Sequence, residues 1–490
     1  MKTKAPERKS LMKSRPGWET ESKERLSYYL YFAGQNAIYA LKANYLVQYI
    51  DFMFTQDEKK ITSLIILLAG IWDAVNDVVF GLIFDKVRFK SGKKYIPWLR
   101  ISLPLIPITT ILLFSIPSGS SSAMKYAWLA IAHLLWDASY TLCDVPIFGI
   151  ITSMTKSLEE RTSALSYKSI WSGVGSGVAI VAGSLLVGQQ FKLNFTFAAI
   201  VCGVFAIATM LPACFRLQER YEGEDEESFT LKKMMKYLVS NKYLLIYYLG
   251  YFFYSSANVF GLINMFAAFY FYRNEQISLL AQACSIVPSL IAALIVPHLL
   301  RKIDKMKVFR ACALLAIGAS VIMWIPGYQS LSWFIIMSVV RSVPMSVVGV
   351  MLFMFTPDCA EYGLYKTGVD AKGITFSIQT FMAKITSAVS SAFVSFVLGL
   401  GWVGWQTYKN ADGKAIENFG ELAEIGATQT PHALNCLWFL YVLVPAIGYA
   451  IAYVIWKFYK LNDKDVQVMI DCNAGKITRE EAEASLSRKY

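Results

Sequence analysis

Apolar residues occur along the chain in twelve blocks of about twenty, and the short segments between the blocks carry most of the charge. The hydrocarbon core of a bilayer is about 30 Å thick, and a helix of about twenty apolar residues crosses it. The pattern therefore predicts an all-α membrane protein with twelve transmembrane helices. The predicted spans are 28–50, 61–84, 96–116, 126–152, 165–188, 194–214, 243–271, 277–299, 307–326, 331–356, 372–402 and 434–456.

The twelve spans divide into two groups of six around one long charged segment, which contains an acidic run at 222–227. Short basic loops, 85–94 and 301–307, follow the second span of each group and are weak evidence for an internal repeat. Two six-helix bundles around a midplane cavity are typical of the major facilitator fold. The expected organisation is an N-terminal segment 1–27, a first bundle 28–214, a central loop 215–242, a second bundle 243–456 and a C-terminal tail 457–490.

Composition and charge agree with this topology. The 490-residue chain is 55% hydrophobic and 17% charged, whereas a soluble domain carries about a quarter charged residues. If residues at the span ends are counted with their loops, the inner segments hold 35 Lys and Arg and the outer segments hold 7. The positive-inside rule then predicts that both termini are cytoplasmic, and residues 1–27 lack the pattern of a signal peptide. We expect a multi-pass protein of the inner (plasma) membrane, with a net charge of +12 that reflects topology rather than nucleic-acid binding.

The eight cysteines and three histidines are scattered, and no CxxC pair is present. This distribution predicts apolar packing of the cysteines rather than a disulfide framework or a metal cluster. No cofactor is expected.

The second span contains two carboxylates on one helical face. Asp73 and Asp77 are four residues apart, with Asn76 beside them. Two like charges this close repel, so one takes a proton or both hold a cation. Carboxylate and amide oxygens suit a hard cation such as Na⁺. The alternative is that a neighbouring Lys or Arg satisfies the pair.

Other ionisable residues are also expected inside the membrane, where a charge is costly and is usually functional. Asp137, Thr141 and Asp144 share a face of the fourth span, and Lys42 of the first span lies at a similar depth to Asp137. A Lys42–Asp137 ion pair is therefore expected, either in the cavity or only as a brace between two helices. The other buried bases are Lys168, Arg341 and Lys384.

An ordered set of motifs resembles the glycoside–pentoside–hexuronide:cation symporters, and the resemblance covers residues 26–400. The motifs are Trp72–Asp77, Asp85–Trp98, Tyr140–Pro146, Glu160–Lys168, Asp358–Gly368 and Ser377–Lys384.

The resemblance implies roles for individual residues. The coupling-cation site would comprise Asp73, Asn76, Asp77 and Thr141, with Asp73 and Asp77 as Na⁺ ligands. Asp144 would bind sugar hydroxyls, Lys384 would lie near both sites, and Lys168 stands where the family usually has an arginine, unless the alignment slips to Ser169. The substrate site is predicted to include Gln35, Asn36, Lys42, Asp144, Phe148, Lys168, Arg341, Gln379, Thr380 and Lys384.

The departures from the family pattern affect selectivity. Gln35 and Asn36 replace a charged Lys-Asp pair, and Phe148 stands where a tryptophan stacks on the sugar. Amides still hydrogen-bond hydroxyls, so a sugar remains the expected substrate, although the family's galactoside selectivity is not inherited. Four buried bases balance four buried acids; the bases are Lys42, Lys168, Arg341 and Lys384, and the acids are Asp73, Asp77, Asp137 and Asp144. A bound cation would therefore leave the cavity with a net positive charge. This charge favours an anionic sugar such as a hexuronide over a neutral one.

Three function classes follow from the sequence. The first is symport of a sugar or glycoside coupled to Na⁺ or H⁺, with Na⁺ preferred because Asn76 and Thr141 add neutral oxygens. The alternative is a major facilitator carrier for a non-sugar amphiphile or lipid-like solute, suggested by the tyrosine-rich span 243–271. The third class, a membrane enzyme or sensor, is not predicted, since no nucleophile–base pair or nucleotide loop is present. We expect a monomer in the lipid bilayer.

The last segments of the chain carry weaker signals. Thr478, with Glu481 three residues on, predicts a capped helix in the C-terminal tail. This helix is expected to be solvated and without a partner, and the alternative is that it docks on the protein in a regulatory role. The polar segment 403–433 is assigned no role.

Overall fold

The computed structural model describes residues 18–87, 89–221, 231–368, 371–410 and 413–490. Within these ranges the regular structure is helical, apart from one isolated bridge between Lys409 and Ala415. Ten helical stretches are long and apolar enough to cross a membrane. Two further helices, α1 (Ser22–Met53) and α2 (Glu58–Lys86), match them in length. The prediction of an all-α membrane fold with twelve spanning helices is confirmed.

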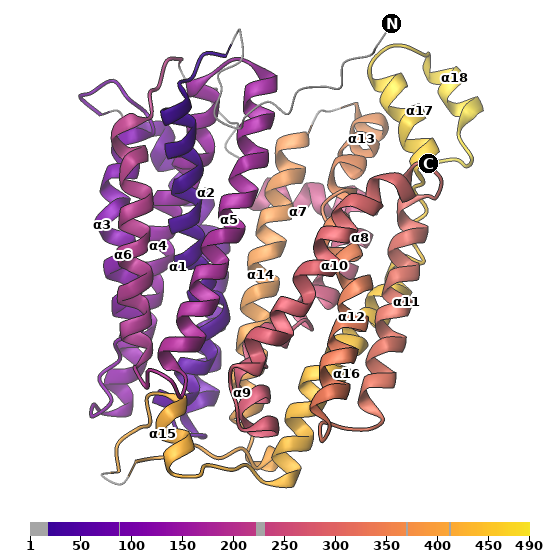
Figure 1. Ribbon diagram of the computed structural model, residues 1–490. Coiled ribbons are helices and arrows are strands. Elements are labelled where there is room, and N and C mark those ends of the chain that lie inside the picture. The colour runs from indigo at the N-terminus through magenta and orange to yellow at the C-terminus, as the bar shows by residue number, and fades with distance from the viewer. Residues whose placement is uncertain (1–17, 88, 222–230, 369–370, 411–412) are drawn as a thin grey trace, which may run out of the picture.

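The first half contains α1 to α6, coloured indigo to magenta in Figure 1. Three of its helices begin with side chains that cap the first turn, where backbone N–H groups lack helical partners. Ser121 caps α4 (Ser122–Met154), Ser157 caps α5 (Leu158–Val187) and Asn194 caps α6 (Phe195–Arg216). The remaining helix of this half is α3 (Ile96–Leu113).

The second half contains six spans, two of which are interrupted. The predicted span 243–271 breaks at 257–259, and the predicted span 331–356 breaks at 352–354 before its helix continues to Thr367. Neither break contains proline or glycine, so the sequence did not mark them. The helices are α8 (Lys242–Ser256), α9 (Phe260–Tyr272), α10 (Ile277–Leu300), α11 (Lys305–Trp324), α12 (Leu331–Met351), α13 (Phe355–Thr367), α14 (Lys372–Leu398) and α16 (Pro431–Trp456).

Part of the predicted central loop is helical, since α7 spans Leu231–Ser240. Asn241 then caps α8 and donates its side-chain amide to the carbonyl of Cys359 at 2.8 Å. The acidic run at 222–227 and Arg88 of the first basic loop lie outside the described residues, as does most of the segment 1–27. The boundaries 28–214 and 243–456 of the two bundles remain a prediction.

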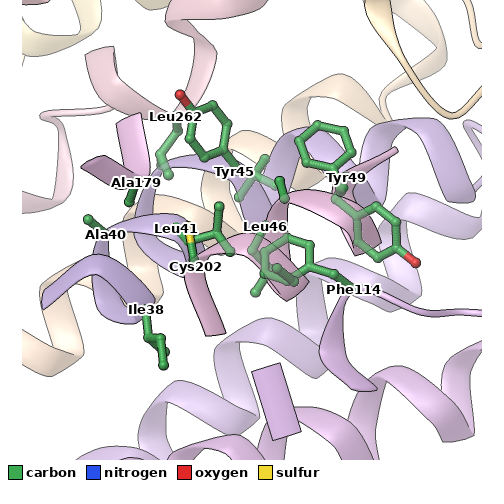
Figure 2. Close-up of a cluster of buried hydrophobic side chains, with 14 of the residues drawn as sticks. Ile38, Ala40, Leu41, Tyr45, Leu46, Tyr49, Phe114, Ala179, Cys202 and Leu262 are labelled. Carbon is green, nitrogen blue, oxygen red and sulfur yellow. The ribbon is translucent and has the colours of Figure 1, made fainter. Parts of the chain in front are cut away.

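Helix α1 lies at the centre of the packing. Small residues let α5 approach it closely, because a Cβ on Gly175 would collide with the carbonyl oxygen of Ala33. Figure 2 shows Tyr45 and Leu46 of α1 in one buried cluster with Cys202 of α6 and Leu262 of α9. The core therefore continues from the first half into the second, and α2 packs against α14 in the same way.

One end of the molecule is closed by the connection 399–430 between α14 and α16, which carries α15 (Phe419–Glu424) (Figure 1). The buried Trp405 donates its Nε1 to both carboxylate oxygens of Asp51, at 3.1 and 3.2 Å. Lys59 Nζ lies 2.5 Å from Asp51 Oδ1 and donates to Thr407 at 3.2 Å. A segment to which the sequence assigned no role therefore joins the second half to α1 and α2.

The opposite end, which we call the terminal end, carries α17 (Asp463–Asn473) and α18 (Arg479–Ser485) (Figure 1). The predicted capping box of Thr478 and Glu481 is present. The expectation of a helix without a partner is wrong, because Arg479 stacks on Tyr365 of α13 at 3.8 Å from the ring centre. Asn473 also donates to the Glu361 carboxylate at 2.9 Å.

The end of the tail folds back on α17. Burial raises the pKa of Asp465, but hydrogen bonds from Ser487, Tyr490 and Asn462 outweigh burial and hold that pKa below its usual range. The fold-back is therefore stable while Asp465 is ionised.

Replacing Lys59 with Met would leave Asp51 as a buried carboxylate without its counter-ion. Breaking a buried ion pair from one side costs about 3–5 kcal/mol. We expect Lys59→Met to unfold at a clearly lower temperature than wild type in a thermal-shift assay in detergent. The matched control is Lys60→Met, at the exposed neighbouring position, which should unfold close to wild type. Equal unfolding temperatures for the three proteins would contradict this role of the pair.

Candidate functional site

Three charged side chains meet where the two halves touch. Asp73 and Asp77 lie one turn apart on α2, and Lys384 of α14 reaches between them. Lys384 Nζ lies 2.9 Å from Asp73 Oδ1 and 2.7 Å from Asp77 Oδ2. Lys384 is therefore the neighbouring base required by the interpretation in which a Lys or Arg satisfies the pair. Its ammonium occupies the place where the other interpretation puts a cation.

Neutral oxygens complete this candidate cation site. Asn76 is fully buried and donates its Nδ2 to Thr141 Oγ1 at 3.0 Å. Thr141 Oγ1 lies 3.1 Å from Asp77 Oδ1, to which it donates. The amide oxygen of Asn76 is buried without a hydrogen-bond partner. Two carboxylates, an amide oxygen and a hydroxyl are the ligand types that a hard cation prefers.

A second group of predicted residues lies on α1, α4 and α5. Gln35 Nε2 donates to Asp144 Oδ1 at 2.6 Å. Lys168 Nζ lies 4.4 Å from the ring centre of Phe148, which is 40% exposed. This group offers a carboxylate, amides, an ammonium and an aromatic face, which together can bind the hydroxyls and the apolar face of a sugar ring.

Asn36 belongs to the same region and donates to Ser172 Oγ at 3.1 Å. Sequence reasoning missed Ser172 and also Phe32, whose ring lies 5.3 Å from that of Phe148. Ser172 follows Lys168 by four residues, so helical spacing could have indicated it.

The predicted pair of Lys42 and Asp137 is present, with Lys42 Nζ 2.5 Å from Asp137 Oδ1. Lys42 also lies 3.9 Å from the ring centre of Trp136, which stacks on Tyr140. A cavity of about 80 Å³ is bounded by Lys42, Asp73 and Lys384 among others. The pair therefore lies close to the candidate cation site, on its side towards α15.

Gln379 and Thr380 precede Lys384 on α14 by five and four residues. The Oε1 atom of Gln379 is buried without a hydrogen-bond partner, and Thr380 is exposed. Both therefore offer polar groups for a ligand on the terminal side of Lys384.

Arg341 lies apart from these residues, within the second half. Its NH1 donates to the backbone carbonyl oxygen of Tyr441 at 3.1 Å, a contact that braces α12 against α16. The same side chain also lines a cavity of about 430 Å³ bounded by α9, α10, α12 and the break before α9. Among the described residues, no acidic side chain forms an ion pair with it.

The tyrosines of span 243–271 do not form a surface for an amphiphile. Tyr247, Tyr248, Tyr251 and Tyr254 are buried in the core of the second half. Packing therefore accounts for the aromatic residues that suggested a lipid-like substrate.

Twelve spanning helices in two halves, with buried charges where the halves meet, are typical of a multi-pass membrane transporter of the major facilitator fold. A solved structure of the nucleoside transporter NupG has a similar fold, with a TM-score of 0.60 at 11% identity, covering 89% of this chain and 99% of that one. A family model described as "MFS/sugar transport protein" matches residues 28–463, and the chain belongs to this family.

Individual relatives are distant but match over most of their length. The isoprimeverose transporter of Lactiplantibacillus pentosus is 22% identical, covering 91% of this chain and 90% of the relative. The glucuronide carrier protein homolog of Escherichia coli (strain K12) is 23% identical, covering 83% of this chain and 85% of the relative.

The structure leads to a prediction for Lys384. In Lys384→Met, Asp73 and Asp77 would repel each other without an internal counter-ion, so an added cation should stabilise the variant more than it stabilises wild type. We expect the variant to unfold earlier than wild type in Na⁺-free choline buffer and to gain more in unfolding temperature when Na⁺ is added. An equal or smaller gain than in wild type would show that Lys384 does not occupy the place of a cation.

Proposed function

We propose that this protein is a secondary active transporter that carries a sugar or glycoside together with a cation by alternating access. The observation that carries the proposal is the contact of Lys384 with Asp73 and Asp77. This contact links the two halves next to the group of Gln35, Asp144, Lys168 and Phe148, which suits a sugar. The names of the two relatives, an isoprimeverose transporter and a glucuronide carrier homolog, support a sugar substrate.

The coupling follows from the geometry of α4. In this proposal the cation binds Asp73, Asn76, Asp77 and Thr141 and displaces the Lys384 ammonium. Thr141 and Asp144 are three residues apart on α4, so a cation held at Thr141 steadies the carboxylate that binds the sugar. Each ligand then strengthens binding of the other by the same factor, as linkage requires.

We further propose that the terminal end faces the cytoplasm and that the connection 399–430 faces outwards across a plasma membrane. The excess of Lys and Arg in the segments on the terminal side supports this orientation. The neutral oxygens of Asn76 and Thr141 favour Na⁺ over H⁺ as the coupling ion. The transporter is proposed to act as a monomer.

The substrate is proposed to be an anionic glycoside. Arg341 presents a planar fork that suits a carboxylate, and it lines a cavity large enough for a sugar. Ser338 Oγ in the wall of this cavity is buried without a hydrogen-bond partner, so it can donate to the same group. The carboxylate would thus bind in the second half, and the sugar ring would bind in the first half, at Asp144, Gln35, Lys168 and Phe148.

The cation site can be tested by transport. Asp73→Asn or Asp77→Asn removes a charged ligand, so we expect each variant to lose cation-driven accumulation of substrate in proteoliposomes while remaining folded. Asp57→Asn is the control, because Asp57 is exposed at the start of α2, and it should accumulate substrate like wild type. Normal accumulation by both site variants would show that the cation binds elsewhere.

The charge of the substrate can be tested by comparing a hexuronide with its neutral parent glycoside. A hydrogen bond to a charged group contributes about 1.5–3 kcal/mol, so Arg341→Gln should weaken binding of the hexuronide by roughly tenfold or more and spare the neutral sugar. Arg301→Gln, at an exposed position, is the control. If the neutral sugar binds wild type as well as the hexuronide does, the anionic assignment is wrong.

A further inference from the structure

His133 lies next to the Lys42–Asp137 pair, one helical turn before Asp137 on α4. Asp137 has no exposed surface, and its Oδ1 is held by Lys42. The other oxygen, Oδ2, has no hydrogen-bond partner, although His133 Nε2 lies 3.9 Å away. His133 is itself 2% exposed, and its Nδ1 has no partner. Both groups therefore lack hydrogen bonds that buried polar groups normally make.

A proton on His133 would supply the hydrogen-bond donor that Asp137 Oδ2 lacks. The imidazolium has two N–H donors, and a small movement of the ring would bring one of them to Asp137 Oδ2. A hydrogen bond between an imidazolium and a carboxylate is stronger than one between neutral groups. The cavity of about 80 Å³ that His133 lines has room for several water molecules, which can deliver the proton.

The charged side chains around this cavity favour the binding of one more positive charge. Three carboxylates, Asp73, Asp77 and Asp137, face two ammonium groups, Lys42 and Lys384. Their sum is one negative charge while His133 is neutral. A coupling cation at Asp73 and Asp77 brings the sum to zero, and a proton on His133 does the same.

The other neighbours of His133 do not alter this balance. Tyr39 of α1 and Tyr140 of α4 line the same cavity with phenols that are neutral at physiological pH. On α3, which packs on another face of α4, the ionisable side chain is Arg100, and it donates to the carbonyl of Cys214. The groups facing His133 are thus Lys42, Asp137 and, across the cavity, Asp73 and Lys384.

We propose that His133 is a proton-binding site that competes with the coupling cation through charge, without sharing its ligands. Protonation of His133 weakens cation binding at Asp73 and Asp77, so the affinity for the cation falls as the pH falls. The inference rests on the proposed cation site for its effect, although proton binding at His133 can be measured without any cation. His133 and Thr141 are eight residues apart on α4, which is about 12 Å along the helix. A unit charge at that distance, at an effective dielectric constant of about 20, changes a binding constant about tenfold.

The first experiment counts protons. Full-length protein in detergent and Na⁺-free buffer is titrated between pH 8.0 and 5.0, as wild type, His133→Gln and His298→Gln. His298 is exposed on α10 and shows whether the assay resolves one histidine. We expect each variant to bind about one proton fewer than wild type. If His133→Gln binds as many protons as wild type while His298→Gln binds one fewer, the proposed site does not exist.

The second experiment measures Na⁺ binding, through the Na⁺-dependent rise in unfolding temperature, at pH 8.0 and 5.5. Wild type and His298→Gln should lose about tenfold in affinity at the lower pH, and His133→Gln should lose little. An equal loss in His133→Gln would overturn the competition, because Asp73 or Asp77 would then be the group that titrates. Absence of Na⁺ binding in wild type at both pH values would instead count against the proposed cation site, and the proton count alone would decide the role of His133. Should His133→Gln not fold, His133→Met serves in both experiments.

Discussion

Lys384 holds two carboxylates of the other half in a part of the protein where an unpaired charge would be costly. Asp73 and Asp77 cannot both remain ionised at this distance without a positive group between them. The ammonium belongs to α14 in the second half, and the two acids belong to α2 in the first half. The charges of Asp73 and Asp77 are therefore neutralised only while the second half holds Lys384 in this position. In the proposed mechanism, a cation that replaces the ammonium removes this dependence and frees α14 to move relative to α2. Charge compensation and the relative motion of the halves are thus one physical problem in this protein.

Much of the fold was predictable from the sequence because apolar length and charge position directly reflect the bilayer. The spacing of Asp73 and Asp77, and the matched depths of Lys42 and Asp137, were readable because a helix has a fixed rise and period. The breaks at 257–259 and 352–354 were not readable, since they contain no proline or glycine. Gly448 of α16 lies against Ala257 and the carbonyl of Phe253, so the first break packs against a helix almost 200 residues away in sequence.

The parts of the site that were missed depend on contacts between distant segments. Sequence reasoning grouped Arg341 with the other buried bases by hydropathy alone, but its actual neighbours are Tyr441 and Phe260. His133 was considered only as a metal ligand and set aside, although its spacing of four residues from Asp137 is visible in the sequence. The connection was assigned no role and the tail helix was expected to be solvated, because the sequence does not show that Trp405 contacts Asp51 or that Asn473 contacts Glu361.

Helix α4 connects the proposed ionic sites, so they can influence one another without a large rearrangement. His133, Asp137, Thr141 and Asp144 follow one another at intervals of four, four and three residues, so they form one polar stripe. Asn76 of α2 donates to Thr141 and lies 3.4 Å from the carbonyl oxygen of Asp137. A charge added at one position of the stripe therefore acts on the next through a rigid helix and in apolar surroundings that screen it weakly. In the proposed function, the order along α4 is a proton site, a cation site and a sugar site, and the state of the two ions would be transmitted to the substrate pocket along this single helix.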